Sequence, residues 1–103
     1  MREIRLAQLD KTRPVLILTR EIARPYLRLV AVAPITSTVK GLSTEVPVGP
    51  ANGLDHDCVV SCDNVQTIPA TSLGQTVGFL HPGQEPALAE AIRSAFELAD
   101  PTA

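Results

Sequence analysis

An arginine at the start of one apolar run and two hydroxyl residues at the end of another could together bind a phosphate group. Arg13 precedes the run that begins Pro14-Val15-Leu16, and Thr36 and Ser37 follow a second apolar run that ends at Ile35. A guanidinium matches phosphate geometry and stays charged, and hydroxyls donate to the same oxygens. These groups suit RNA cleavage by the RNA's own 2′-hydroxyl, which needs in-line positioning and neutralisation of charge at the phosphoryl oxygens. Taken alone, each segment is also typical of an ordinary polar strand end.

The charged residues are distributed unevenly along the chain. The net charge is −2 over 103 residues, but residues 1–40 hold eight basic and three acidic side chains, and residues 41–103 hold one and eight. A split of this kind can give an acidic protein one positive face, which is the kind of surface that binds a phosphate backbone. The alternative is that the two halves interleave in space and leave no such face.

The two cysteines and two histidines form no recognisable site in the sequence. Cys58 and Cys62 would lie about 13 Å apart on one face of a strand, too far for a disulfide. His56 is close by, but no second Cys/His pair completes a zinc site. We therefore expect buried free thiols, surface positions for His56 and His81, and no metal or other cofactor. Of the three aromatic side chains, we expect only Tyr26 to be exposed for stacking on RNA bases.

Apolar runs of strand length, separated by turns, occupy most of the chain. We expect strands at residues 3–9, 13–19, 27–34, 44–48, 58–62 and 65–69. Residues 20–25 suit one helical turn, and residues 72–80 mix strand and helix signals. Residues 85–99 predict an amphipathic helix, because apolar side chains recur there every three or four positions. Pro86 suits the first turn of this helix, and Pro101 is expected to end it.

These elements predict one α+β domain over residues 1–103, built on a curled antiparallel sheet with a C-terminal amphipathic helix. A chain of this size gains stability from oligomerisation. The longest apolar runs have the length of strands, so we expect no membrane span. The chain begins Met1-Arg2-Glu3-Ile4, without the apolar stretch of a secretory signal, and this indicates a cytoplasmic protein.

Two motifs resemble the central motifs of the MazF/PemK (Kid) family of toxin endoribonucleases. Lys11-Thr12-Arg13-Pro14, which leads into an apolar strand, resembles the family's Arg-Pro segment. Ala33-Pro34-Ile35-Thr36-Ser37-Thr38-Val39-Lys40-Gly41 resembles its P-x-T segment. In that family the arginine and the threonine lie close together in the RNA-cleaving site. The order, the spacing and the later segments also fit, so the resemblance covers nearly the whole chain.

The resemblance implies the SH3-like barrel that these toxins share with the gyrase poison CcdB. It implies the toxin of a toxin–antitoxin system, which cuts single-stranded RNA at a short sequence without a metal ion. The 2′-hydroxyl would attack, leaving a 2′,3′-cyclic phosphate and a 5′-hydroxyl, and Arg13 and Thr36 would be the catalytic residues. The residues expected to bind RNA are Lys11, Ser37, Thr38, Lys40, Arg20 and Arg24. The family acts as homodimers, and the acidic, partly disordered tail of a MazE-like antitoxin closes their RNA groove.

Two segments depart from the family pattern. Asp63 matches an aspartate that some PemK-type members use in catalysis with an arginine two residues earlier, where this chain has Ser61. Asp63 is therefore either catalytic or a structural cap of the turn between two strands. The loop at residues 9–12 is shorter than the corresponding loop in most members. We therefore expect an open site, to which the sequence specificity of other members does not carry over.

Two other functions remain open at this point. A binding toxin on the same barrel would poison gyrase as CcdB does. That activity depends on an aromatic-containing C-terminal tail, and residues 98–103 hold no aromatic side chain. The other is an interaction module whose catalysis has decayed, which the short loop and Ser61 would suggest. Incubation with RNA in EDTA separates a metal-independent nuclease from both.

Overall fold

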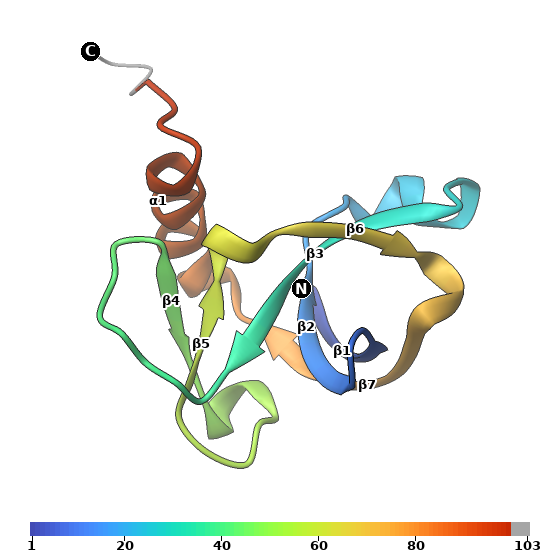
Figure 1. Ribbon diagram of the computed structural model, residues 1–103, viewed down its shortest axis with the longest axis horizontal. Coiled ribbons are helices and arrows are strands. Elements are labelled where there is room, and N and C mark those ends of the chain that lie inside the picture. Colours follow the sequence, from blue (N-terminus) through green and yellow to red (C-terminus); the bar gives the residue numbers. More distant parts are fainter. Residues whose placement is uncertain (100–103) are drawn as a thin grey trace.

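A strongly curled antiparallel sheet, with one α-helix packed at one end, forms the framework of the protein (Figure 1). The computed structural model describes residues 1–99. Its elements, in chain order, are β1 (Arg2–Gln8), β2 (Thr12–Ile17), the 3₁₀ helix η1 (Glu21–Tyr26), β3 (Leu29–Thr36), β4 (Glu45–Val48), η2 (Pro50–Asn52), β5 (Cys58–Ser61), η3 (Cys62–Asn64), β6 (Gln66–Pro69), η4 (Ala70–Ser72), β7 (Leu73–Leu80), η5 (Pro82–Gln84) and α1 (Glu85–Ala95). This is the predicted architecture of a curled antiparallel sheet with a C-terminal helix.

Strand β3 is the centre of the sheet. The strand order is β4-β5-β3-β2-β1-β7, and β6 also pairs with β3. One edge of β3 pairs with β2, while the other edge pairs first with β6 at Leu29–Val32 and then with β5 at Ile35 and Thr36. Strands β5 and β6 are thus successive parts of one extended segment, and the short helix η3 forms a kink between them. This kink lets one long strand belong to both halves of the curl.

Apolar side chains alternate between the two faces of the sheet and make two cores. Along β2, Leu16 belongs to the core under α1, whereas Val15 and Ile17 belong to the opposite core. This is the period of two that a strand imposes. The core under α1 consists of Ile4, Leu16, Ala33, Ile35, Val46, Val48, Cys58, Val60, Cys62, Leu80, Leu88 and Ala91. The opposite core, which we call the inner-face core, consists of Ala7, Val15, Ile17, Val30, Val32 and Ile68. Both cysteines are buried free thiols, as predicted.

The ambiguous residues 72–80 form strand β7, which pairs with β1 along the edge of the sheet. The strand packs tightly against η2 near its end. A Cβ added at Gly78 would overlap the carbonyl oxygen of Asn52. The Asn52 side chain is buried and donates to the carbonyl of Phe79 at 2.9 Å and to Oε1 of Gln84 at 2.7 Å. Gly78 is therefore required by this close packing, and it does not indicate a helix.

The C-terminal helix is shorter than the sequence predicts. The expected helix over 85–99 ends at Ala95, because Glu97 adopts a left-handed conformation with φ +53°. The N–H of Leu98 then bonds the carbonyl of Arg93, and that of Glu97 bonds Ser94, which is the Schellman termination. Phe96, expected on the apolar stripe, is consequently 56% exposed. Pro101, expected to end the helix, lies outside the described residues. Within residues 1–99, no helix has both the length and the apolar character needed to cross a membrane.

Candidate active site

The register of β2 and β3 brings Arg13 and Thr36 together. Val15 lies opposite Pro34 and Ile17 lies opposite Val32 in this antiparallel pair. Arg13 stands two residues before Val15, and Thr36 stands two residues after Pro34. The two residues therefore lie just beyond the same end of the paired region. Arg13 also continues the β2 series that faces the inner-face core, and Thr36 continues the corresponding β3 series. The two residues predicted to be catalytic therefore share one end of one face.

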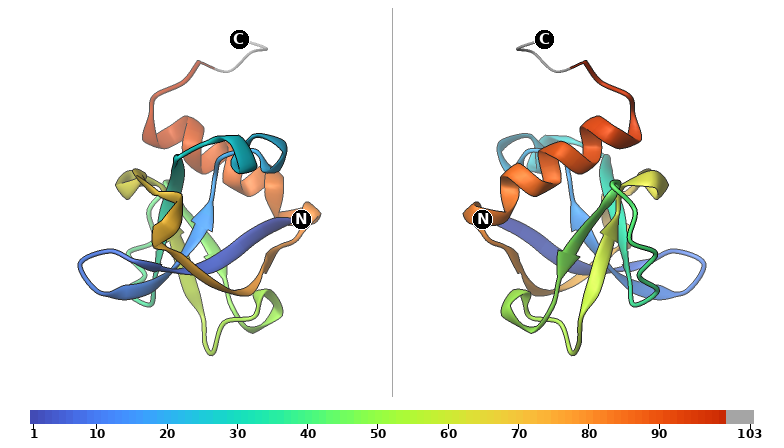
Figure 2. Two further views of the ribbon diagram at one scale, coloured as in Figure 1. Left: turned by 90° about the vertical axis from the view of Figure 1, so that its right-hand side faces the viewer. Right: turned by 90° about the vertical axis from the view of Figure 1, so that its left-hand side faces the viewer.

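That end of the sheet is hollowed into an open cleft of about 610 Å³. Its walls come from the β1–β2 hairpin, the end of β3, the segment between β3 and β4, and the segment from β5 to β6. The hairpin and the β3–β4 segment project on the same side of the sheet (Figure 2). The lining residues are Leu9, Asp10, Arg13, Pro34, Thr36, Thr38, Lys40, Leu42, Glu45, Ser61, Asp63, Asn64 and Gln66. The hairpin loop contributes Leu9 and Asp10 to this lining.

Arg13 is half-buried and held by a neighbouring carboxylate. Its Nη2 lies 3.2 Å from Oδ2 of Asp10, and the other carboxylate oxygen accepts the backbone N–H of Lys11 at 3.0 Å. The Lys11 N–H, and then the Arg13 guanidinium, hold the pKa of Asp10 below its ordinary value. The Nε of Arg13 is buried and donates no hydrogen bond within the described part of the chain. The guanidinium is thus oriented by one bond and keeps donors for an anion.

Thr36 is the last residue of β3, where the strand passes into the following loop. Its Oγ1 accepts the backbone N–H of Thr38 at 3.1 Å. Because this bond uses a lone pair of the hydroxyl oxygen, the hydroxyl proton remains available to a second acceptor. The bond restricts the rotation of the side chain as well. Thr36 therefore presents a donor whose position is set before any ligand arrives.

Asp63 lines the same cleft, at the kink between β5 and β6. Its Oδ2 accepts the hydroxyl of Thr44 at 2.6 Å. The contact ties the kink to the segment that precedes β4, and it favours the structural alternative for Asp63 over the catalytic one. Ser61, which stands where some family members have an arginine, accepts a hydrogen bond from the Asn64 side chain at 2.8 Å.

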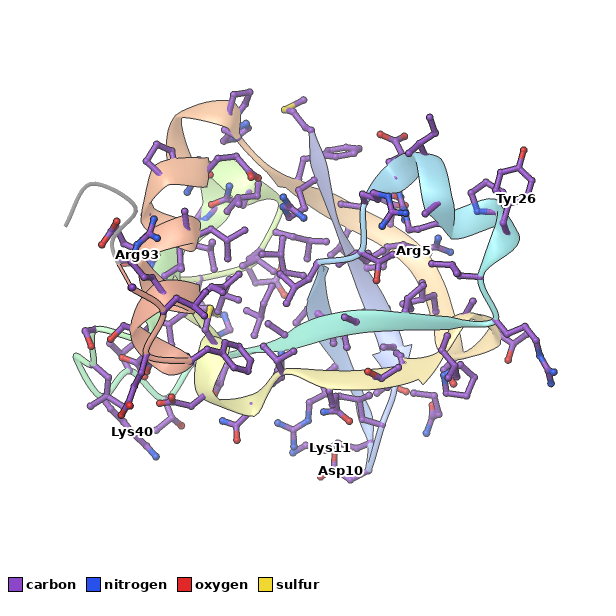
Figure 3. All side chains as sticks on the ribbon, turned by 90° about the horizontal axis from the view of Figure 1, so that it is seen from above. Arg5, Asp10, Lys11, Tyr26, Lys40 and Arg93 are labelled. Atoms are coloured by element: carbon purple, nitrogen blue, oxygen red, sulfur yellow. The ribbon has the colours of Figure 1, made fainter. Side chains whose placement is uncertain are left out.

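The residues predicted to bind RNA fall into three groups. Thr38 and Lys40 line the cleft. Lys11 and Ser37 are exposed beside it: Lys11 lies next to Asp10 at the hairpin tip, on the same side of the molecule as Lys40 (Figure 3). Arg20 and Arg24 line a different cleft, of about 340 Å³, beside the N-terminus. Arg24 is paired there with Glu3 at 2.8 Å. Whether these two arginines contact RNA stays a prediction.

Four polar residues that were not predicted from the sequence also line the cleft. They are Asp10, Glu45, Asn64 and Gln66. One feature of the sequence indicates that Asp10 lies near Arg13, because the two residues are three positions apart across a tight turn. The other three come from distant segments. The pairing of β3 with β5 and β6, and of β4 with β5, brings them near Arg13.

Neither an aromatic platform nor a metal-binding cluster forms part of the described cleft. Tyr26 is 86% exposed, as predicted, but it lies on η1 at the far end of the molecule (Figure 3). None of the described residues that line the cleft is aromatic. Among residues 1–99, no three His, Cys, Asp or Glu side chains gather closely enough to hold a metal ion. Polar and charged groups are what this cleft offers to a ligand.

Comparison with known proteins identifies close relatives. Residues 2–96 match the PemK-like, MazF-like toxins of type II toxin–antitoxin systems. Endoribonuclease MazF3 of Mycobacterium tuberculosis is 65% identical over 98 residues, which cover 95% of this chain and 95% of MazF3. The solved Mycobacterium tuberculosis toxin MazF-mt6 superposes with a TM-score of 0.93 at 63% identity, over 95% of this chain and 99% of that one. A mycobacterial endoribonuclease solved with its cognate antitoxin has the same fold, with a TM-score of 0.85 at 24% identity over 96% and 95% of the two chains. The predicted MazF-type fold is confirmed.

Proposed function

Because the chain belongs to the PemK-like, MazF-like toxins of type II toxin–antitoxin systems, we propose that it cuts single-stranded RNA at a short sequence, without a metal ion, in the cleft that holds Arg13 and Thr36. The family predicted from the two motifs is confirmed. Membership of this family and 65% identity to an endoribonuclease make the chain a toxin with endoribonuclease activity. The site, the chemistry and the sequence preference are the further content of the proposal.

The proposed reaction is an in-line transesterification within the RNA. The 2′-oxygen forms a bond to the adjacent phosphorus, the bond from phosphorus to the 5′-oxygen breaks, and the proton of the 2′-hydroxyl passes to water. Arg13 neutralises the charge that develops on the phosphoryl oxygens and donates a proton to the leaving 5′-oxygen. The hydroxyl of Thr36 donates a hydrogen bond to a phosphoryl oxygen. The products are a 2′,3′-cyclic phosphate and a 5′-hydroxyl.

The observation that carries the proposal is that Arg13 and Thr36, which lie beyond the same end of the β2–β3 pairing, both line one cleft. Arg13 is already oriented by Asp10, and Thr36 is already oriented by the N–H of Thr38. Donors that are held in place before the charge develops stabilise a transition state more than donors that must be reorganised. A guanidinium stays protonated at neutral pH and is therefore a poor base, which favours the role of donor over that of base.

The proposed partners are RNA, a cognate antitoxin and a second copy of the chain. The family is defined by toxin–antitoxin pairs, and one relative of the same fold was solved with its antitoxin. An acidic, disordered antitoxin tail would compete with RNA for Arg13 and Lys40. We propose the cytoplasm as the place where the chain meets RNA and the antitoxin. Exposed apolar side chains at Ile22, Tyr26 and Leu29 supply surface of the kind that dimers bury.

The test is cleavage of a long single-stranded RNA in EDTA, with the ends mapped by sequencing and by direct phosphorylation of 5′-hydroxyl groups. The variants are Arg13→Ala and, as a matched control, Arg93→Ala, which removes an arginine from α1 on another side of the molecule (Figure 3). We expect discrete cuts with 5′-hydroxyl ends from the wild type and from Arg93→Ala, and none from Arg13→Ala. Cutting by Arg13→Ala would refute the site assignment. Cutting that needs a divalent metal, or 5′-phosphate ends, would refute the chemistry.

A further inference from the structure

The segment between β3 and β4, residues 37–44, has no regular secondary structure, and we call it the β3–β4 loop. Backbone N–H groups outside helices and sheets need other acceptors. In the middle of this loop one side chain supplies them. The carboxylate of Glu45 accepts the N–H of Lys40, at 3.2 Å to Oε1 and 3.3 Å to Oε2, and the N–H of Leu42 at 3.0 Å to Oε1.

Gly41, between these two residues, allows the loop to turn around the carboxylate. Its φ is +74°, in the left-handed region that favours glycine. N–H groups on such a turn converge on one point and form a concavity that binds an anion. Glu45 fills this concavity, and its own N–H returns a bond to the carbonyl of Leu42 at 3.1 Å. Hydrogen bonds to a charged acceptor are stronger than those between neutral groups, so this closed ring of bonds holds the middle of the loop firmly.

The other hydrogen bonds of the loop fix only its two ends. At the start of the loop, the N–H of Thr38 donates to Oγ1 of Thr36. At its far end, the hydroxyl of Thr44 donates to Asp63, the carbonyl of Thr44 accepts the N–H of Cys62, and the hydroxyl of Ser43 lies 2.6 Å from that of Ser94 on α1. None of these bonds involves residues 39–42. Glu45 is therefore the side chain that fixes the part of the loop on which Lys40 stands.

Glu45 also lines the cleft together with Arg13 and Lys40. A carboxylate repels the phosphates of RNA, so its place in this cleft calls for a role that outweighs the repulsion. The bonds to the loop supply that role. Lys40 is exposed on the same side of the molecule as the β1–β2 hairpin (Figure 3), and its long side chain reaches a given phosphate only if its backbone is held in place.

We propose that Glu45 is a positioning residue for RNA binding. Its carboxylate holds the β3–β4 loop in one conformation, so that Lys40 meets the phosphate backbone of an RNA strand in the cleft. This inference rests on the proposed function, since it assumes that RNA occupies the cleft. Glu45 does not contact the RNA and acts through Lys40, so it governs the binding of RNA and not the chemical step.

The experiment measures kcat and KM for RNA cleavage, together with the affinity for the same RNA carrying a 2′-deoxy group at the mapped cut. The variants are Glu45→Ala, Glu45→Gln, Lys40→Ala and the double variant Glu45→Ala/Lys40→Ala. Glu90→Ala is the matched control, because it removes one negative charge from α1 outside the cleft. Hydrogen exchange of the Lys40 and Leu42 amides reports the order of the loop directly, whatever the activity.

We expect Glu45→Ala to raise KM and Kd about tenfold, with kcat within about threefold of wild type. Glu45→Gln should recover part of the loss, because its amide oxygen still accepts hydrogen bonds. The double variant should bind RNA no more weakly than the weaker single variant, since both changes remove one effect. The two amides should exchange slowly in wild type and fast in Glu45→Ala.

Four outcomes would overturn the proposal. A collapse of kcat in Glu45→Gln at unchanged KM would place Glu45 in the chemical step. Tighter binding by Glu45→Ala would mean that the carboxylate competes with phosphate for the concavity. Additive losses in the double variant would separate Glu45 from Lys40, and unprotected amides in the wild type would remove the clamp itself. Failure of the wild type to cut RNA is a different result, because it counts against the proposed function and leaves the exchange test in force.

Discussion

Replacement of Thr36 by valine tests whether the hydroxyl at the end of β3 stabilises the transition state. Valine keeps the shape of threonine and removes only the hydroxyl. In the folded protein that hydroxyl accepts the N–H of Thr38 and keeps its proton for a second partner. The substitution therefore deletes one preorganised donor and one exposed turn contact, and leaves Arg13 and its bond to Asp10 in place.

The magnitude follows from these two losses. Deletion of one preorganised donor to a developing oxyanion lowers kcat by about 10²–10³, or about 2.7–4 kcal/mol. The N–H of Thr38 is exposed and can bond to water instead, so the loss of stability should stay below about 1 kcal/mol. For a chain of this size that is a change in Tm of at most about 4–8 °C. The loss of activity should thus be far larger than any loss of folded protein.

The assay is single-turnover cleavage of an RNA with one cut site, at protein concentrations that saturate it. Thr36→Val should lower the rate by about 10²–10³, and Thr36→Ser, which keeps the hydroxyl, should stay within about tenfold of wild type. Near-wild-type cleavage by a folded Thr36→Val would refute the role of the hydroxyl. Equal loss in both variants would instead assign the effect to the threonine methyl group and its packing.

Three other properties follow from the structure. Burial, followed by the charge of Asp63, raises the pKa of Cys62 to about 11, so at pH 8 only about one Cys62 thiol in 1,000 is ionised. A thiol reagent should therefore label Cys62 only when the protein unfolds. Rapid labelling of the native protein would contradict this. Gly78→Ala should lower the free energy of unfolding by about 2–4 kcal/mol in urea titrations, because its Cβ overlaps the Asn52 carbonyl; an unchanged midpoint would show that η2 yields easily. If Arg13 and Lys40 are the phosphate contacts, log Kd for RNA should change with log salt with a slope of magnitude about 1.4, and a slope beyond about 3 would bring in other basic residues.

The sequence predicts most of the strands because their apolar residues alternate or run continuously between turn residues. It predicts the end of the helix poorly for a local reason. A Schellman termination usually has glycine in the left-handed position, and here that position is Glu97, which gives no signal. The apolar stripe continues through Phe96 and so favours a longer helix than the one that forms. The mixed signals of 72–80 arise in the same way, because Gly78 is required by contact with Asn52, a residue remote in sequence.

The candidate site is predicted in part. Arg13 and Thr36 stand in segments that resemble the two central motifs of the MazF/PemK family, and this resemblance singles them out. Glu45, Asn64 and Gln66 could not be found in this way, because each is an ordinary polar residue at the start of a strand or in a turn. They line the cleft because β5 and β6 pair with the same edge of β3 and β4 pairs with β5. Which side chains surround a site depends on register, and single residues carry little information about register.

The charge of the cleft differs from what the uneven charge of the chain suggests. Of the cations in the first forty residues, only Arg13 and Lys40 line the cleft, while Asp10, Glu45 and Asp63 line it too. By formal charge the lining is therefore negative, and bulk attraction cannot be what holds RNA there. Each of the three carboxylates is bonded to a neighbouring donor of the protein, from a side chain or the backbone. Their charge is directed into the protein, whereas the donors of Arg13 and the side chain of Lys40 remain for the ligand. On the proposed function, affinity for RNA comes from where two cations are held, and two of the carboxylates that oppose binding hold them: Asp10 bonds Arg13, and Glu45 bonds the backbone of Lys40.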